Sequence, residues 1–148
     1  MENVIKGKTK FTDHSLYPMS VVQKKVLCAI DFSNPSHQAL KWAVDFSRSI
    51  GCNLAVLYSY RLTRRLNEDI LALKKRIELE ALDHFSQFES EYLSNANLTY
   101  EFKVEIGFIA DRVEDFANKN SISFIVMDKT VYTRTRETFD ELLELANV

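Results

Sequence analysis

The chain contains few residues of the kinds that build disulfide frameworks or metal sites. Its 148 residues include two cysteines and three histidines. Cys28 and Cys52 both lie beside predicted strands, which is typical of buried, reduced cysteines and disfavours a disulfide or a metal pair. The three histidines, His14, His37 and His84, have no acidic or cysteine partner at the spacing of metal ligands. The sequence therefore predicts no metal site.

Long apolar runs and a strong excess of one charge are also missing. No segment is apolar for long enough to span a bilayer, and residues 1–8 lack the apolar core of a secretory signal. The formal net charge is -2, which provides no basic field to hold nucleic acid or an anionic membrane surface. We therefore expect a cytoplasmic protein that binds neither nucleic acid nor membranes.

What the chain does contain is a regular alternation of strand-like and helix-like segments. Residues 26–30 form a continuous apolar run, which is typical of a strand buried on both faces. Asp31 and Ser33 then place a carboxylate and a hydroxyl at the carboxyl end of this strand, where open α/β sheets bind ligands. We expect Asn34 to cap the following helix and Pro35 to lie in its first turn.

The same alternation continues to the end of the chain. Further strands are predicted at 53–58, about 98–106 and 122–127, and helices at about 35–50, 66–92, 109–119 and 137–146. Gly51 offers the left-handed stop that ends many helices. The third predicted strand alternates apolar and polar residues, as an edge strand would. The apolar composition of the fourth predicts a buried strand. The inward stripe of the first helix is expected to contain Ala39, Leu40, Ala43, Phe46, Ser47 and Ile50, with Trp42 near its edge. This pattern predicts an α/β fold, an open parallel sheet with helices on both faces.

Several segments, in order and spacing, resemble the universal stress protein family. They are KVLCAIDFS at 25–33, ALKWA at 39–43, GCNLAVL at 51–57, GFIADRV at 107–113 and SFIVM at 123–127. The resemblance implies a Rossmann-like sheet, of the adenine-nucleotide alpha-hydrolase-like type, with strand order 3-2-1-4-5 in the family. Family members commonly form dimers, and a subset bind ATP.

The family's ATP-binding members carry a glycine loop after the fourth strand, which is missing from this chain. The loop has a glycine, two residues, a glycine, nine residues, and then a glycine with serine or threonine. Its glycines let backbone amides approach phosphate oxygens. Without gaps, these positions hold Asp128, Val131, Glu141 and Leu142, and no glycine follows Gly107. The chain therefore resembles a member that lacks the ATP-binding loop, with two carboxylates that would repel phosphate.

The resemblance still implies candidate residues for a nucleotide, should one bind. Asp31 matches the family's acidic residue at the end of the first strand, and Ser33 follows it. Ser59 and Met127 fall where the family lines its adenine pocket, and Lys129 offers a charge for phosphate. The residue pattern itself favours Asp31 and Ser33 as turn and cap residues, and Lys129 as part of a solvated loop. These five residues are the candidate cofactor-binding set, with ATP and Mg²⁺ as the alternative to no cofactor.

Motifs of catalysis are absent, which leaves two classes of function. No Gly-x-Ser-x-Gly nucleophile elbow occurs, and neither does a His-x-Gly-His or Ser-Gly-Gly signature. We therefore expect no catalytic residues and no enzyme, while a weak ATPase activity stays open. The first class is a stress-response adaptor that acts through protein–protein contacts without ATP. The alternative is an ATP- or AMP-binding stress sensor with an altered phosphate loop.

The end of the predicted sheet also departs from the family. The family's fifth strand, which commonly forms its dimer contact, is missing or replaced, so the expected order is 3-2-1-4. We divide the chain into an extension, residues 1–24, and a universal stress protein-like domain, residues 25–148. We expect part of the extension, about Val4 to Phe11, to pair with the exposed edge of the fourth strand, in the same chain or in a partner. A homo-oligomer, most simply a dimer, is the expected assembly.

Overall fold

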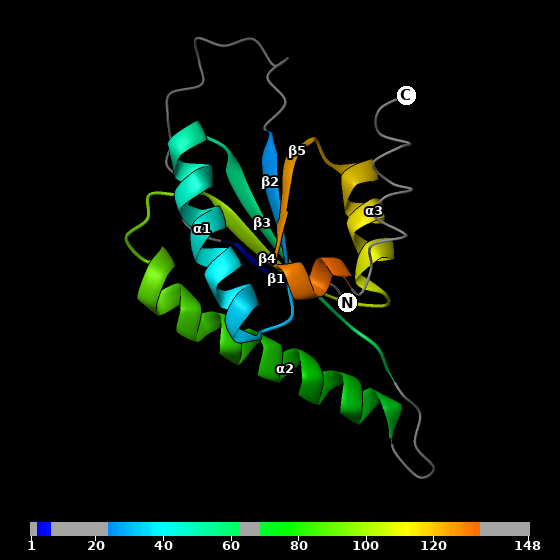
Figure 1. Ribbon diagram of the computed structural model, residues 1–148. Helices are drawn as coiled ribbons and strands as arrows, with labels where there is room; N and C mark the ends of the chain where they lie inside the picture. Colours follow the sequence, from blue (N-terminus) through cyan, green and yellow to red (C-terminus); the bar gives the residue numbers. More distant parts are fainter. Residues whose placement is uncertain (1–2, 7–23, 63–68, 134–148) are drawn as a thin grey trace, which may run out of the picture.

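A computed structural model describes residues 3–6, 24–62 and 69–133, which form one five-stranded sheet with helices on both sides (Figure 1). The strand order is β1-β4-β3-β2-β5, and the last four strands in this order are parallel. Read from the first parallel strand, this is the order 3-2-1-4, so the predicted fold is confirmed. The strands are β1 (Asn3–Lys6), β2 (Lys25–Ile30), β3 (Asn53–Tyr60), β4 (Tyr100–Ile106) and β5 (Ile122–Met127).

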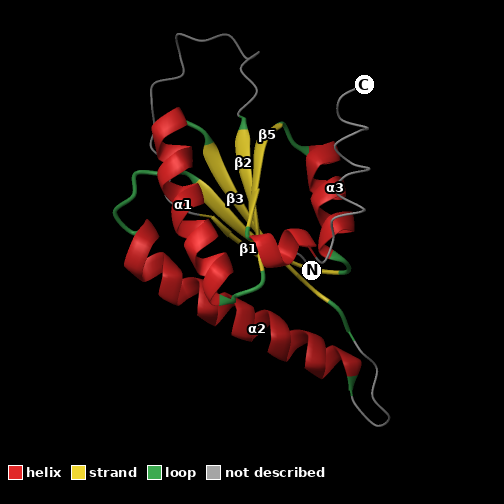
Figure 2. Ribbon diagram, viewed as in Figure 1, coloured by secondary structure: helices red, strands yellow, loops and turns green. Residues whose placement is uncertain are grey.

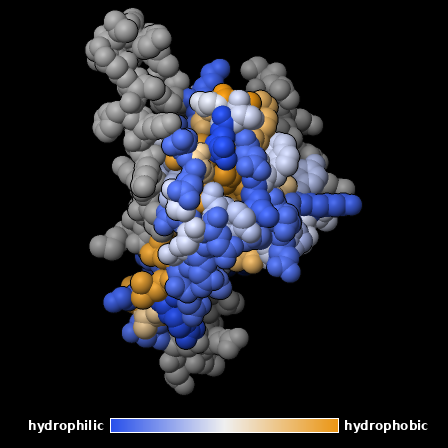
Figure 3. All heavy atoms as spheres, turned by 90° about the vertical axis from the view of Figure 1, so that its left-hand side faces the viewer, coloured by the Kyte–Doolittle hydropathy of each residue, from blue (hydrophilic) through white to orange (hydrophobic). Residues whose placement is uncertain are grey.

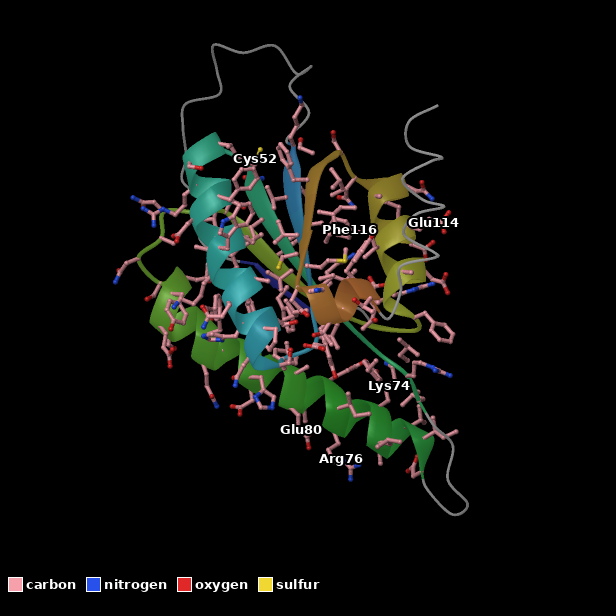
Figure 4. The ribbon with its side chains drawn as sticks, viewed as in Figure 1. Cys52, Lys74, Arg76, Glu80, Glu114 and Phe116 are labelled. Atoms are coloured by element: carbon pink, nitrogen blue, oxygen red, sulfur yellow. The ribbon has the colours of Figure 1, made fainter. Side chains whose placement is uncertain are left out.

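The helices divide between the two faces of the sheet. They are α1 (Asn34–Ile50), α2 (Ile70–Phe88), which continues as the π-helical turn η2 (Glu89–Leu93), and α3 (Ile109–Lys119). α1 and α2 pack on one face and α3 on the other (Figure 2). On the first face, Phe85 stacks on Phe102 with 4.2 Å between ring centroids. On the second face, Phe116 points from α3 toward the strands (Figure 4).

The outer surface of the helical layer is mostly polar. Figure 3 views the flank that carries α1 and the carboxyl end of α2, and it shows a largely hydrophilic face with scattered hydrophobic groups. The core therefore lies between the helices and the strands. The predicted helix at 137–146 and residues 66–68 of the predicted long helix lie outside the described residues.

The start of α1 differs from the prediction by one residue. The N-cap is Ser33, not Asn34, because the Ser33 hydroxyl oxygen accepts a hydrogen bond from the Ser36 amide at 3.4 Å. At the other end, Gly51 ends the helix with φ +70, the left-handed conformation that glycine adopts without strain. Ile50, predicted to face inward, is 40% exposed, because the helix turns this last residue away from the sheet.

The amino-terminal segment joins the sheet at the edge opposite to the predicted one. β1 runs antiparallel to β4, whereas we expected the segment to pair with the strand that is now β5. The register places Asn3 opposite Val104 and Lys6 opposite Glu101. Consequently β4 is not an edge strand in the full sheet.

β5 lies at the edge of the sheet, as the predicted order 3-2-1-4 implies, but it is less buried than its apolar sequence predicted. Among the described residues, β5 pairs only with β2. Phe124 is 49% exposed and Ile125 is 39% exposed, although both look like core residues in the sequence. β5 is apolar like an inner strand, but it has a neighbouring strand on one side only, so part of its side-chain surface stays exposed.

Candidate site at the carboxyl ends of β2 and β5

The candidate site lies where the strand order reverses. The chain leaves β2 toward β3 on one side, while β5 lies on the other side of β2. In open α/β sheets this point is the usual place for a ligand. In Figure 1 it is at the lower end of the sheet, beside the start of α1 and the orange helical turn at 129–133 that follows β5.

A tight turn connects β2 to α1 and uses two of the predicted site residues. The Ser33 amide donates to Asp31 Oδ1 at 3.0 Å, and the Ser33 hydroxyl donates to the same oxygen at 2.5 Å. The Ser33 oxygen in turn caps α1 through the Ser36 amide. Asp31 and Ser33 therefore lie together, and their described contacts are those of a turn and a helix cap.

Ser36 links this turn to the other side of the crevice. Its side chain is 1% exposed, and its hydroxyl accepts a hydrogen bond from the Asp31 amide at 3.1 Å. The same hydroxyl donates to Asp128 Oδ2, from a position 92 residues earlier in the chain. The first turn of α1 is thus tied directly to the residue that follows β5.

Asp128 holds the backbone amides on the β5 side. It is 7% exposed, and its Oδ1 accepts hydrogen bonds from the amides of Thr130 at 2.8 Å and Val131 at 3.1 Å. Burial raises the pKa of the neighbouring Cys28 thiol, and the negative charge of Asp128 raises it further. The carboxylate is therefore an internal anion at the switch point, bound by groups of the kind that would otherwise bind a phosphate.

An open cleft lies beside this crevice, on the face covered by α2. Phe32 lines this cleft, with φ 63, a left-handed conformation that is uncommon for a bulky residue. Its ring contacts Tyr58 at 4.7 Å and His84 at 5.2 Å between centroids. The cleft has a volume of about 470 Å³, and Asp31 and Glu80 also line it. Burial and then the charges of these two carboxylates raise the pKa of the Tyr58 phenol.

The other predicted site residues are not brought into this arrangement. Ser59 lies opposite Glu105 on β4, and strand alternation places it on the α3 face, away from Tyr58. Met127 packs against the apolar cluster under α3. Lys129 is exposed, and its carbonyl accepts the Thr133 hydroxyl at 2.7 Å. Among the described contacts, only Asp31 and Ser33 of the predicted set touch each other.

Two residues that organise the site were not predicted, although the sequence contains a signal for one. Ser36 looks like an ordinary helix residue, and only the fold shows that it reaches Asp128. Asp128 follows an apolar strand and precedes a helical turn, the position of an N-cap, so its bonds to the next amides could be foreseen. The site has no metal centre within the described ranges, where no three His, Cys, Asp or Glu side chains are grouped. Figure 4 shows Cys52 at the far, amino end of the strands.

No helix in the described part of the chain is both long enough and apolar enough to cross a membrane.

Comparison with known proteins identifies the relatives of this fold. A model of the universal stress protein family matches residues 23–143. A structure from that family in Burkholderia pseudomallei has a TM-score of 0.65 at 20% identity, and the match covers 87% of this chain and 93% of that chain. The universal stress protein UspA from Lactobacillus plantarum has a TM-score of 0.61 at 19% identity, with 72% and 77% covered. A comparison with curated protein sequences gave no match.

Proposed function

Because the chain belongs to the universal stress protein family, we propose that it is a non-catalytic stress-response adaptor that acts through protein–protein contacts without ATP. The observation that carries this proposal is the position of Asp128. Its carboxylate binds the Thr130 and Val131 amides and the Ser36 hydroxyl at the switch point of the sheet. A phosphate there would have to displace this carboxylate and would meet its negative charge at short range.

Thermal unfolding with nucleotides tests the proposal. We expect no change in melting temperature when ATP or AMP is added with Mg²⁺. A nucleotide that binds only the folded chain, at a hundred times its dissociation constant, would add about 2.7 kcal/mol of stability. For a chain of this size that corresponds to a rise of roughly 5–10 °C. A rise of this kind would contradict the proposal.

A nucleotide-binding sensor is the second candidate, and the open cleft favours it. The cleft beside Asp31 and Tyr58, with about 470 Å³, lies within the roughly 300–1,000 Å³ of small-molecule pockets. In this case Lys129, which is exposed at the start of the helical turn, would bind the phosphates in place of the glycine loop. A rise in melting temperature with ATP that disappears in Lys129→Ala would support the sensor. Slow hydrolysis would be detected separately, by following the release of phosphate from ATP.

The proposal includes a location and an assembly. A cytoplasmic location is supported by Cys28 and Cys52, which are both free thiols. For the assembly we propose a homo-oligomer, because an adaptor without a catalytic site works through its surfaces. Nucleic acid and membranes are not part of the proposal, since the chain carries a net charge of -2.

A further inference from the structure

The open cleft under α2 has a wall of aromatic rings. Tyr58 lies next to Phe32, with 4.7 Å between their ring centroids. It also stacks on Tyr60, with 6.3 Å between centroids and 23° between planes. These rings come from β3 and from the turn after β2, and all three line the same cavity. The faces of phenyl and phenol rings carry partial negative charge, so this wall attracts cations.

Two carboxylates add full negative charges to the same lining. Asp31 directly follows β2 and Glu80 lies on α2, and both line the cleft together with Tyr58. After burial, the charges of these two carboxylates are the causes that raise the pKa of the Tyr58 phenol. Charges that disfavour a phenolate at this position favour a positive charge beside it. The rings and the carboxylates therefore attract ligands of the same sign.

The basic side chains of the lining have contacts of their own. Arg61 lines the cleft, and its guanidinium lies over the ring of Phe108, 4.2 Å from the centroid. His84 contacts the ring of Phe32, with 5.2 Å between centroids. A phosphate in the cleft would meet both carboxylates, whereas an ammonium group would be attracted by them. The chemistry of the cleft thus differs from that of a phosphate site.

We propose that this cleft binds a small organic cation, an ammonium group on an apolar body, between the Tyr58 ring and the Glu80 carboxylate. The volume of about 470 Å³ lies within the roughly 300–1,000 Å³ of small-molecule pockets. Ile77 and Ala81 of α2 also line the cleft and offer apolar surface to the body of the ligand. This site goes beyond the proposed function, because it gives an adaptor without ATP a ligand that is not a nucleotide.

Three probes that share a phenyl group and differ in charge test the class of ligand. They are 2-phenylethylammonium, 2-phenylethanol and phenylacetate, each titrated into the full chain and followed by the NMR signals of the probe. We expect the cation to bind about tenfold more tightly than the alcohol, and the anion not to bind. No binding of the cation, equal binding of all three, or a preference for the anion would overturn the proposal.

Variants of the aromatic wall test the role of Tyr58. Tyr58→Leu keeps an apolar side chain but removes the ring, so the dissociation constant of 2-phenylethylammonium should rise about fivefold. Tyr58→Phe keeps the ring and should bind the cation as the unmodified chain does. The melting temperature of each variant checks that it keeps the fold. Equal affinity in Tyr58→Leu and Tyr58→Phe would remove the ring from the site.

A charge variant on the helix surface tests the carboxylate without touching the core. Glu80 is exposed, so Glu80→Gln should keep the fold while the dissociation constant of the cation rises about threefold. Its affinity for 2-phenylethanol should not change. Glu114→Gln is the matched control, because it removes the same charge from α3, on the other face of the sheet (Figure 4). Equal effects of the two variants would contradict a contact with Glu80.

ATP distinguishes the failure of this proposal from the failure of the proposed function. If the cation does not bind and the melting temperature does not respond to ATP, the cleft ligand is overturned and the adaptor without ATP stands. If the cation binds and ATP raises the melting temperature without displacing it, the cleft ligand stands and the proposed function is contradicted. Displacement of the cation by ATP contradicts both.

Discussion

At the scale of single residues, one carboxylate sets the character of the candidate site. Asp128 accepts three hydrogen bonds, two from backbone amides and one from Ser36. Each of these donors is near the switch point, where a ligand would otherwise compete for it. Asp128 is thus the acceptor that these three donors share.

We predict that Asp128→Ala and Asp128→Asn differ clearly in stability. Alanine removes the cap of the 129–133 turn and leaves the buried Ser36 hydroxyl without this acceptor, a loss of about 2–3 kcal/mol. Asparagine keeps an oxygen that can accept from the Thr130 and Val131 amides, so we expect a smaller loss. Urea unfolding of both variants measures the difference. Equal losses would mean that the hydrogen bonds of the carboxylate are not what matters at this position.

Phe32 has a strained backbone, and the contacts of its side chain offset that strain. Its left-handed backbone costs roughly 1–2 kcal/mol in a residue with a Cβ atom. The same backbone turns the ring into contact with Tyr58, His84 and Phe102. The aromatic contacts and the buried area offset the strain, because a phenyl ring in such a cluster gains more than that when it leaves water.

At the scale of secondary-structure elements, the boundaries follow local hydrogen bonds. α1 begins one residue before its predicted start, because the Ser33 hydroxyl reaches the Ser36 amide. α3 and β5 keep their predicted bounds, Ile109–Lys119 and Ile122–Met127. These two elements have short, clear apolar patterns, whereas serine and asparagine at 33 and 34 are both good caps and the sequence does not separate them.

The cap assignment leads to a paired prediction. Ser33→Ala should lower the free energy of unfolding by about 0.5–2 kcal/mol, since it removes the cap of α1. Asn34→Ala should change it little or raise it slightly, because Asn34 is exposed inside the helix and alanine has the higher helix propensity. Urea titration of the two variants side by side decides between them. A larger loss of unfolding free energy in Asn34→Ala than in Ser33→Ala would show that Asn34, the cap predicted from the sequence, is the true N-cap.

At the scale of the whole molecule, the two edges of the parallel sheet differ in whether another strand covers them. β1 pairs with β4 and closes one edge, although it is 94 positions or more away from that strand in sequence. The other edge is β5, where Phe124 is 49% and Ile125 is 39% exposed. Within the described residues, the chain thus covers one edge of its parallel strands with its own segment and not the other.

Removal of β1 should therefore affect the whole sheet. A chain without residues 1–6 exposes the backbone of β4 along Tyr100–Ile106. We expect a lower unfolding free energy and earlier aggregation on heating, because an open strand edge pairs with other chains. Urea unfolding and light scattering during a thermal ramp test this, with the full chain as the reference. Unchanged behaviour in both would show that β1 adds nothing to the stability of the sheet.

The fold could be predicted from sequence because its signals are local. The apolar run of β2, the stop at Gly51 and the alternation of strands with helices lie within short segments, and their order limits the topology to a parallel sheet with right-handed crossovers. The site was only partly predictable. The neighbours Asp31 and Ser33 were placed together, but the exposed Phe124 and the inner Ser36 each depend on which element packs beside them.

What the sequence by itself determined is therefore the family, the strand order 3-2-1-4 and the lack of any glycine after Gly107. Each depends on residue identity and spacing along the chain. The tertiary structure alone decided that β1 covers β4 and that Asp128 holds Ser36. These facts depend on contacts between distant residues, 92 positions apart for Ser36 and Asp128, and no local pattern encodes such a distance. The position of the Asp128 carboxylate at the switch point is a consequence of that packing.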